Sequence, residues 1–323
     1  MQHSAVGSCA DVRLNNGEMM PSMALGTAQA KGDLLQTAVE YALDIGYRHI
    51  DTARVYDNEA DIGKVLGKQI GSGKIKRNNL FVTTKLPLYH MGEKDVKLSV
   101  QETLGLLQLE YLDLVLVHVP WACKQLHNIP PGQMLTDANF ASLDFVATWH
   151  ALEVVVREGL VRSIGLSNFT QQQIERIWEN AEIKPANLQL ECHVYLQQPA
   201  LRSYCQQRGI VVTGYCPLGS PGRADKYRRE DDPDLLNDPV VRDIAKQLGR
   251  TPAQIVLRFL MEINVIPLPK SVHPDRISEN LQAVDVTLGN VEMDRLRALN
   301  RNRRFMRFEW FKNHPEYFEN DDF

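Results

Sequence analysis

Residues 80–119 read LFVTTKLPLYHMGEKDVKLSVQETLGLLQLEYLDLVLVHV. Two apolar runs rich in Val, Leu and Thr, at 80–86 and 112–119, flank an amphipathic segment at 96–109. Continuous apolar runs are typical of strands that are buried on both faces, as in a parallel sheet. We therefore predict that these residues form one strand–helix–strand unit of a parallel α/β sheet.

The same alternation continues on both sides of this unit. Two further helix candidates lie at 33–46 and 239–249, and further strand candidates lie at 24–28, 49–53, 161–166, 187–193, 210–216 and 265–270. Eight alternations in a chain of 323 residues predict a (β/α)₈ TIM barrel, folded as a single domain over residues 1–323. The pattern alone leaves a doubly wound sheet as the alternative.

Four segments stand outside the alternation. Residues 11–23 carry an Asn-Gly pair between short extended runs, which predicts an N-terminal β-hairpin. Long loops are expected at 120–141, after the fourth strand, and at 217–236, after the seventh. Loops of this length are usually functional, and barrels place their active sites at the carboxyl ends of the strands. The tail, 301–323, is aromatic and charged, so we expect it to pack on the barrel.

Composition and charge argue against several classes of protein. The net charge of −4 is unlike that of a nucleic-acid binder, which usually carries a basic face. The five cysteines are odd in number and form no C-x-x-C pair, which argues against a disulfide framework or a metal site. No apolar segment is long enough to span a membrane or to act as a signal sequence. We expect a cytoplasmic protein without nucleic-acid or membrane partners.

Four polar residues lie at or just beyond predicted strand ends: Asp51, Tyr56, Lys85 and His118. Taken singly, each is more often a packed residue with one hydrogen bond. In a barrel, however, all four would converge on the central mouth. There a lysine would lower the pKa of a neighbouring phenol, a carboxylate would keep that lysine charged, and a histidine would orient a carbonyl oxygen. Such a tyrosine can protonate a developing alkoxide.

Phosphate-binding patterns are sparse. Residues 67–76 look like a P-loop but have the wrong glycine spacing, and no G-x-G-x-x-G follows the first strand. The eighth strand instead runs into residues 270–280, where Ser271 lies at a helix start between Lys270 and Arg276. Helix starts favour anions. The alternative reading is a capped helix with solvated charges.

Longer motifs follow one another in a recognisable order from the hairpin to the eighth helix. They are GYRHIDTARVYDNEADIG (46–63), TTKL (83–86), VHVP (117–120), GLSNF (165–169), LQLECH (188–193), YCPLGS (215–220) and LPKSVHPDRISEN (268–280). In order and spacing they resemble the aldo-keto reductase family, and the resemblance covers nearly the whole chain.

The resemblance implies roles for the strand-end residues. Tyr56 would be the proton donor, Lys85 and Asp51 would tune it, and His118 would orient the carbonyl. Hydride would pass directly from NADPH, without a metal. The residues expected to bind the cofactor are Gly26, Thr27, Asp51, Ser167, Asn168, Gln189, Tyr215, Leu218, Ser220, Lys270, Ser271, Arg276, Glu279 and Asn280.

Within that set, the resemblance assigns each group to a part of the cofactor. Ser167, Asn168 and Gln189 would hold the nicotinamide carboxamide, with Tyr215 stacked on the ring. Leu218 and Ser220 would lie along the pyrophosphate, and Glu279 and Asn280 would meet the adenine. Lys270, Ser271 and Arg276 would bind the 2′-phosphate, which favours NADPH over NADH.

The substrate pocket departs from that of the vertebrate aldose reductases, which line theirs with tryptophans. Three such positions here are Ala28, Pro87 and Val119, so we expect a wider and less aromatic pocket. Val55 is a further candidate for the lining, and Trp121 would partly refill the lost aromatic surface.

The C-terminal loop, 301–323, is expected to border the substrate site. It carries four arginines, and of these Arg304 is our candidate substrate contact. A guanidinium there suits a carboxylate, as in aldehyde reductases that act on sugar acids. The alternative is that the arginines Arg301, Arg303, Arg304 and Arg307 pair with the acidic run at 230–232 or face solvent.

The function predicted from these features is NADPH-dependent reduction of aldehydes and ketones, with sugar-derived or carboxylate-bearing carbonyl compounds as candidate substrates. A second class stays open, because proteins of this fold also serve as channel subunits and lens crystallins. The complete set of four strand-end residues argues against a purely structural role. We expect a monomer whose partner is a small carbonyl substrate.

Overall fold

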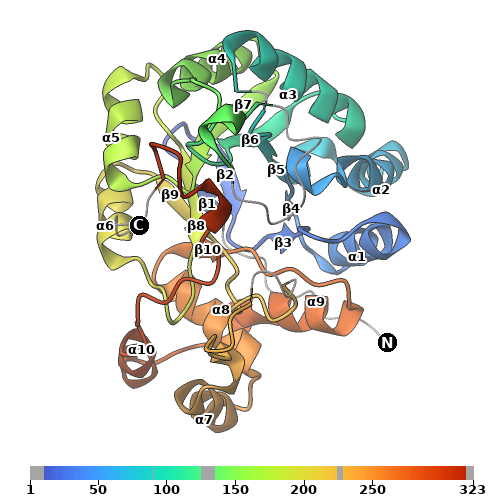
Figure 1. Ribbon diagram of the computed structural model, residues 1–323. Helices are drawn as coiled ribbons and strands as arrows, with labels where there is room; N and C mark the ends of the chain where they lie inside the picture. Colours follow the sequence, from blue (N-terminus) through green and yellow to red (C-terminus); the bar gives the residue numbers. More distant parts are fainter. Residues whose placement is uncertain (1–10, 90, 125–134, 224–227, 318–323) are drawn as a thin grey trace.

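The computed structural model describes residues 11–89, 91–124, 135–223 and 228–317. Its centre is a parallel sheet of eight strands in the order β3 to β10, and helices surround it (Figure 1). The strands are β3 (Leu25–Gly26), β4 (His49–Asp51), β5 (Phe81–Leu86), β6 (Leu112–Val117), β7 (Val161–Ser167), β8 (Asn187–Glu191), β9 (Val211–Tyr215) and β10 (Val265–Pro267). Each lies within or next to a predicted run, so the predicted strand pattern is confirmed.

The first and last strands meet and close the barrel. Gly26 forms a parallel bridge with Lys270, and its N–H donates to the Pro269 carbonyl at 3.0 Å. A side chain at Gly26 would bring a Cβ within 2.9 Å of the Leu268 carbonyl oxygen, so only glycine fits this approach. The predicted (β/α)₈ architecture is confirmed, and the doubly wound alternative is excluded.

The helices follow the strands in alternation. They are α1 (Gly32–Ile45), α2 (Glu59–Gly71), α3 (Glu93–Leu107), α4 (Phe145–Arg157), α5 (Gln171–Asn180), α6 (Pro199–Gln207), α7 (Pro239–Leu248), α8 (Pro252–Glu262), α9 (Pro274–Leu281) and α10 (Asn290–Arg297). Helix α7 shows how local sequence sets the ends. The Asp238 side chain accepts the Val240 N–H, Pro239 occupies the first turn, and Gly249 ends the helix at φ 60°.

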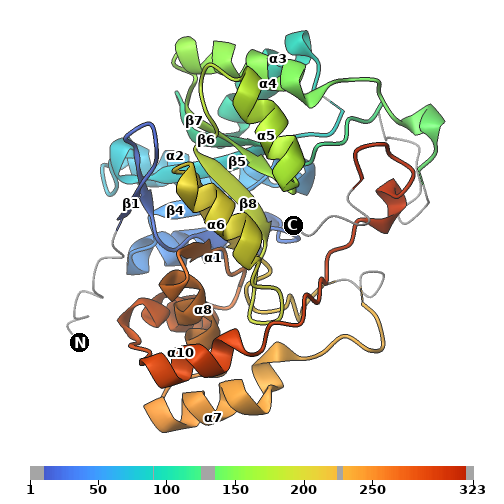
Figure 2. The same cartoon turned by 90° about the vertical axis from the view of Figure 1, so that its left-hand side faces the viewer.

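The predicted hairpin closes one end of the barrel. Strands β1 (Asp11–Arg13) and β2 (Met19–Pro21) pair antiparallel around the Asn-Gly turn. Its side chains Leu14 and Met20 pack with the barrel residues Phe81, Leu114, Leu116, Ala186 and Ile266. In Figure 2 the hairpin and the C-terminal tail lie on opposite sides of the sheet. The strand-end residues therefore face the end that carries the tail.

The described parts of the two long loops are irregular apart from short 3-10 turns, η3 (Asp137–Asn139) and η5 (Leu235–Asn237). The described tail runs to Tyr317 with one turn, η7 (Glu309–Phe311), and crosses the ring of strands in Figure 1. None of the described helices is both long and apolar enough to cross a membrane. That residues 1–323 form a single domain remains a prediction.

Candidate active site

The four strand-end residues come together at one end of the barrel. Asp51 ends β4, Lys85 lies near the end of β5, and His118 follows β6. Tyr56 ends the short turn η1 (Arg54–Tyr56). The Lys85 Nζ donates to Asp51 Oδ1 at 2.7 Å and to the Thr52 carbonyl at 2.8 Å, and lies 3.5 Å from the Tyr56 hydroxyl. The lysine thus joins the carboxylate to the phenol.

Electrostatics keep the phenol protonated and the lysine charged. Burial raises the pKa of Tyr56, and the Lys85 charge opposes this without cancelling it. Burial would lower the pKa of Lys85, but Asp51 and Tyr56 outweigh it, so that pKa is raised. The predicted direction of the lysine's effect on the phenol is right, but burial, which the sequence did not show, is larger. The site therefore presents a phenol proton next to a fixed ammonium.

His118 faces Tyr56 with nearly perpendicular rings, their centroids 6.0 Å apart. Burial, with a contribution from Lys85, lowers the pKa of His118 to about 3, so the imidazole is neutral near pH 7. Within the described residues its buried Nδ1 has no hydrogen-bond partner. Buried polar atoms are nearly always paired, so such an atom is a candidate partner for a ligand.

Asn168, just beyond β7, connects several predicted site residues. It adopts a left-handed conformation, φ 61°, which asparagine tolerates better than most residues. Its Nδ2 donates to the His118 carbonyl at 3.0 Å and to Ser167 Oγ at 3.1 Å. Its Oδ1 accepts the Tyr215 hydroxyl at 2.7 Å. The ends of β7 and β9 are thereby joined to the histidine.

Asp51 makes the corresponding connection on the other side. Its Oδ2 accepts the Gln189 side-chain amide of β8 at 2.8 Å, and its carbonyl accepts the Thr27 hydroxyl at 2.9 Å. Both partners are buried. Gln189 and Thr27 were predicted as cofactor residues; Gln189 contacts the carboxylate that binds Lys85, and Thr27 contacts the backbone carbonyl of the same aspartate.

A second group of predicted residues lies at the start of α9. Lys270 and Arg276 are exposed, and neither forms an ion pair within the described parts of the chain. The Ser271 hydroxyl accepts the His273 N–H at 3.1 Å, which fixes the turn into the helix. The Glu279 carboxylate accepts the Thr251 hydroxyl at 2.7 Å, and Asn280 is buried.

Leu218 and Ser220, the two predicted pyrophosphate residues, follow β9 in a tight turn. Gly219 lies between them at φ 71°, and Ser220 has φ 50°. A Cβ on Gly219 would come within 2.6 Å of the Leu235 side chain, so glycine allows the loop to fold against η5.

The predicted substrate positions are not equivalent in the structure. Val55 is 40% exposed beside Tyr56, Ala28 is half-buried, and Pro87 and Val119 are buried. Trp121 has no exposed surface. Its ring stacks on Phe311 at 4.9 Å and also contacts Phe308 and Tyr317, and its indole N–H donates to the Glu316 carbonyl at 3.0 Å. In this structure Trp121 therefore anchors the tail and offers no surface to a substrate.

The tail arginines differ in the groups that they contact. Arg303 lies 2.9 Å from both Asp231 and Asp232, as the alternative interpretation expected. Arg301 contacts Asp238 at 3.4 Å and lies over the Tyr195 ring. The charge of Arg304 instead acts on Glu191 and Tyr215, close to the predicted site.

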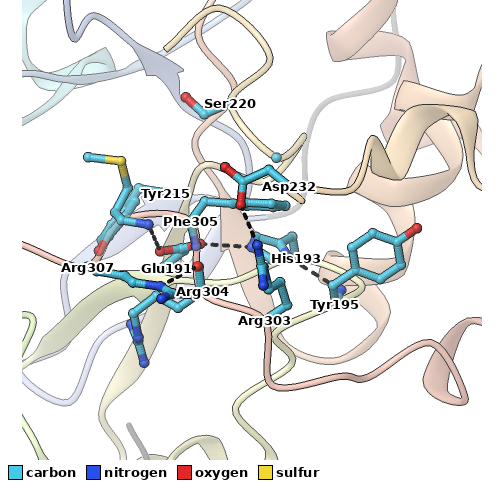
Figure 3. Close-up of polar contacts among 12 residues, drawn as sticks. Glu191, His193, Tyr195, Tyr215, Ser220, Asp232, Arg303, Arg304, Phe305 and Arg307 are labelled. Carbon is cyan, nitrogen blue, oxygen red and sulfur yellow. Dashed lines mark hydrogen bonds and ion pairs between the residues drawn. The ribbon is translucent and has the colours of Figure 1, made fainter. Parts of the chain in front are cut away.

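Sequence reasoning missed Glu191, the last residue of β8. Its buried carboxylate accepts the backbone N–H groups of Phe305 at 2.7 Å and Met306 at 2.8 Å (Figure 3). His193 Nε2 lies 2.9 Å from the same carboxylate. An acidic residue inside the apolar run NLQLECH was a visible signal, because a buried charge requires partners.

Comparisons with known proteins agree with the fold described above. The family model described as "Aldo/keto reductase family" matches residues 22–301. "Aldo-keto reductase family 1 member A1" of Rattus norvegicus is 45% identical over 300 residues, which covers 93% of this chain and 92% of the rat protein. The Gallus gallus protein of the same name is 42% identical over 299 residues, covering 92% of this chain and 91% of the chicken protein.

A solved structure is also similar. The aldose reductase from Schistosoma japonicum superimposes with a TM-score of 0.88 at 38% sequence identity, covering 97% of this chain and 99% of that one. The family match and the sequence identity to these relatives both extend over the whole barrel. This chain belongs to the aldo/keto reductase family.

Proposed function

We propose that this chain reduces aldehydes and ketones to alcohols with NADPH, and that Tyr56 is the proton donor. The observation that carries the proposal is the contact of the Lys85 ammonium with both Asp51 and Tyr56 at the ends of β4 and β5. The family uses a nicotinamide cofactor in general, and the similar proteins named above are aldo-keto reductases and an aldose reductase.

The residues beside this contact fit a nicotinamide ring. The side-chain amides of Asn168 and Gln189, together with the Ser167 hydroxyl, supply the donors and acceptors that a carboxamide needs. Tyr215, which is hydrogen-bonded to Asn168, would support the face of the ring. When bound, the nicotinamide supplies the hydride that reduces the carbonyl carbon.

The start of α9 fits the adenosine 2′-phosphate. Lys270 and Arg276 are exposed cations without an acidic partner in the described chain, and they flank a helix N-terminus. With Ser271 they would recognise the phosphate that distinguishes NADPH from NADH. Leu218 and Ser220 would lie along the pyrophosphate, and Glu279 and Asn280 would contact the adenine.

In the proton-transfer step, the Tyr56 phenol donates its proton to the carbonyl oxygen as negative charge develops there. The Lys85 ammonium stabilises the phenolate that remains, and Asp51 keeps that ammonium charged. A neutral His118 donates one hydrogen bond to the same oxygen and so orients the carbonyl.

For the substrate we propose carbonyl compounds that carry a carboxylate, including sugar-derived ones. Arg304 supports this, because its charge acts beside Tyr215. The tail, residues 301–317 of which are described, would form the border of this site. Val55, Ala28, Pro87 and Val119 would supply its less aromatic lining.

The experiment is NADPH consumption by the purified protein with nitrobenzaldehyde, run in parallel with NADH. Reduction with NADPH, and a clearly weaker reaction with NADH, is the expected result. A protein that consumes neither cofactor with any of a panel of aromatic, aliphatic and carboxylate-bearing aldehydes would contradict the proposal.

A further inference from the structure

Glu191 binds the tail to the barrel through its main chain. Its side chain is completely buried, and its two carboxylate oxygens accept the consecutive N–H groups of Phe305 and Met306. A third donor is His193, whose ring also packs against Phe305 with centroids 4.8 Å apart. One carboxylate thus satisfies three donors from two segments that lie far apart in the sequence.

The donors keep this carboxylate charged although it is buried. Burial alone would raise the pKa of Glu191, but the His193 hydrogen bond, the Arg304 charge and the Phe305 N–H lower it overall. The His193 Nδ1 accepts the Tyr195 N–H at 3.3 Å, so Nε2 must carry the ring proton and donate it to Glu191. The arrangement is fully paired as a carboxylate.

The β8–α6 turn holds the tail at a neighbouring point as well. The Tyr195 carbonyl accepts the N–H groups of Arg301 at 3.1 Å and Arg303 at 3.0 Å. The Arg303 side chain then reaches Asp232 (Figure 3). The Asp232 carboxylate also binds Arg223 in the β9 loop. The tail between residues 301 and 306 is therefore fixed along its backbone.

The Glu191 contacts with the tail lie one strand away from residues of the proposed active site. Glu191 is paired in register with Tyr215 of β9, and its charge raises the pKa of that phenol. Tyr56 contributes in the same direction to the raised pKa of that phenol. Beyond Met306 the tail continues to Phe308 and Phe311, which cover Trp121 next to the β6 end.

We propose that Glu191 is a positioning residue for the substrate site: its carboxylate fixes the tail at Phe305 and Met306, and so sets the affinity for the carbonyl substrate without taking part in proton or hydride transfer. The proposal rests on the proposed reductase function. It assigns a part in placing the tail to this buried carboxylate, in addition to the Tyr195 carbonyl and the Arg303 ion pair.

The test is Glu191→Gln, which keeps the size and shape of the side chain. A carboxamide has one oxygen, and its NH₂ group would face either a backbone N–H or the His193 N–H, so at least one buried donor loses its acceptor. Losing a hydrogen bond to a charged group corresponds to roughly a tenfold effect or more. We expect the KM for the aldehyde to rise about tenfold while kcat and the Kd for NADPH change less than about threefold.

The chain offers a matched control in Glu153 of α4. This carboxylate is also buried, and it accepts the consecutive N–H groups of Glu182 and Ile183 at 2.7 and 2.8 Å. It lies on an outer helix, away from the strand ends. Glu153→Gln should lower the free energy of unfolding as Glu191→Gln does, but it should leave the KM unchanged.

A second readout does not depend on activity. Two tryptophans report on the tail, Trp121 beneath it and Trp310 within it. Iodide quenching of tryptophan fluorescence should increase in Glu191→Gln and not in Glu153→Gln. If Glu191→Gln does not fold, Glu191→Asp keeps the charge but shortens the reach, and it should give the same changes with smaller amplitude.

Three outcomes overturn the proposal: an unchanged KM and unchanged quenching in the Glu191 variant, equal changes in both glutamate variants, or a loss confined to kcat. Failure of the reductase proposal looks different. In that case the wild-type protein reduces no aldehyde, while the quenching comparison between Glu191 and Glu153 still reports whether the carboxylate positions the tail.

Discussion

The barrel mouth and the tail are both held by a buried charge, but the two charges are satisfied in different ways. In the mouth, the Lys85 ammonium binds Asp51 on the adjacent strand, and strand register alone brings the two side chains together. In the tail, Glu191 binds backbone groups 114 and 115 residues further along the chain. The family model reaches residue 301 and so covers the first region and not the second.

This difference indicates that the barrel mouth and the tail serve different steps of the reaction. The strand ends are fixed by the hydrophobic core of the barrel, which gives the reacting groups a rigid frame. The tail is held by aromatic packing on Trp121 and by a few polar contacts, and each polar contact can be altered singly by substitution. Changes in the mouth should therefore affect the chemical step or the cofactor, and changes at the tail should affect the substrate.

The largest expected effect is in the mouth. Tyr56→Phe removes the hydroxyl and keeps the ring, so kcat should fall at least about a hundredfold, the lower range for loss of a general acid. The Kd for NADPH, measured by fluorescence titration, should be largely unchanged. Turnover close to wild type would show that Tyr56 is not the proton donor.

The next effect concerns the cofactor end of the mouth. Replacing Lys270 and Arg276 together by Met should weaken NADPH binding by roughly tenfold per site, because each loses a charge-assisted contact. NADH has no 2′-phosphate, so its Kd should change little. Equal losses for both cofactors would mean that these residues do not recognise that phosphate.

Acid should weaken the barrel before it releases the tail. Burial lowers the pKa of His49, at the start of β4, from 6.5 to about 4. Between those values the unfolded chain binds a proton that the folded chain does not, so the free energy of unfolding falls as the pH falls. At about pH 5 the loss from His49 should be roughly 2 kcal/mol.

The tail carboxylates respond in the same sense but at lower pH. The pKa of Asp232 and that of Glu191 are lowered, so their stabilising contacts persist until the pH falls below the usual carboxylate range. Urea unfolding should therefore become easier between about pH 7 and pH 5, with a shallower dependence in His49→Gln, while iodide quenching of the tail tryptophans stays constant. If iodide quenching increases between about pH 7 and pH 5 before the free energy of unfolding falls, the tail is released first and this prediction is wrong.

A smaller effect is expected for substrate charge. For matched pairs of a carboxylate-bearing aldehyde and its amide, kcat/KM should favour the acid by several-fold, on the order of 1 kcal/mol. Arg304→Ala should remove most of that preference. Arg301→Ala is the control, since its side chain is 53% exposed and already contacts Asp238. The carboxylate proposal fails if acids show no advantage or if both variants behave alike.

Much of the fold could be predicted because it depends on local pattern. The apolar runs at 80–86 and 112–119 appear as β5 and β6, and the Asn-Gly pair appears as the turn of the hairpin. The helix predicted at 239–249 appears as α7, Pro239–Leu248. Once the strands were identified, Asp51 and Lys85 were expected at one end of a closed barrel, and the structure joins them there.

Other features required the tertiary structure. The sequence identified Lys85 as a neighbour that lowers the pKa of Tyr56, but it did not show that burial outweighs this effect. It suggested Trp121 as a pocket wall, whereas the folded tail covers that ring completely. These outcomes depend on which surfaces lose contact with water, and that is decided by the packing of the whole chain.

The sequence by itself determined the barrel, the converging strand ends and the cations at the start of α9, because each follows from residue type and spacing within a short segment. Only the tertiary structure assigned the partners of Glu191, since nothing in its segment specifies a contact with backbone groups 114 residues away. For Arg303 the sequence left two alternatives open, and the structure selected the acidic run. A buried carboxylate requires donors whatever the fold. Which backbone groups supply them depends on where the tail lies once the barrel has closed.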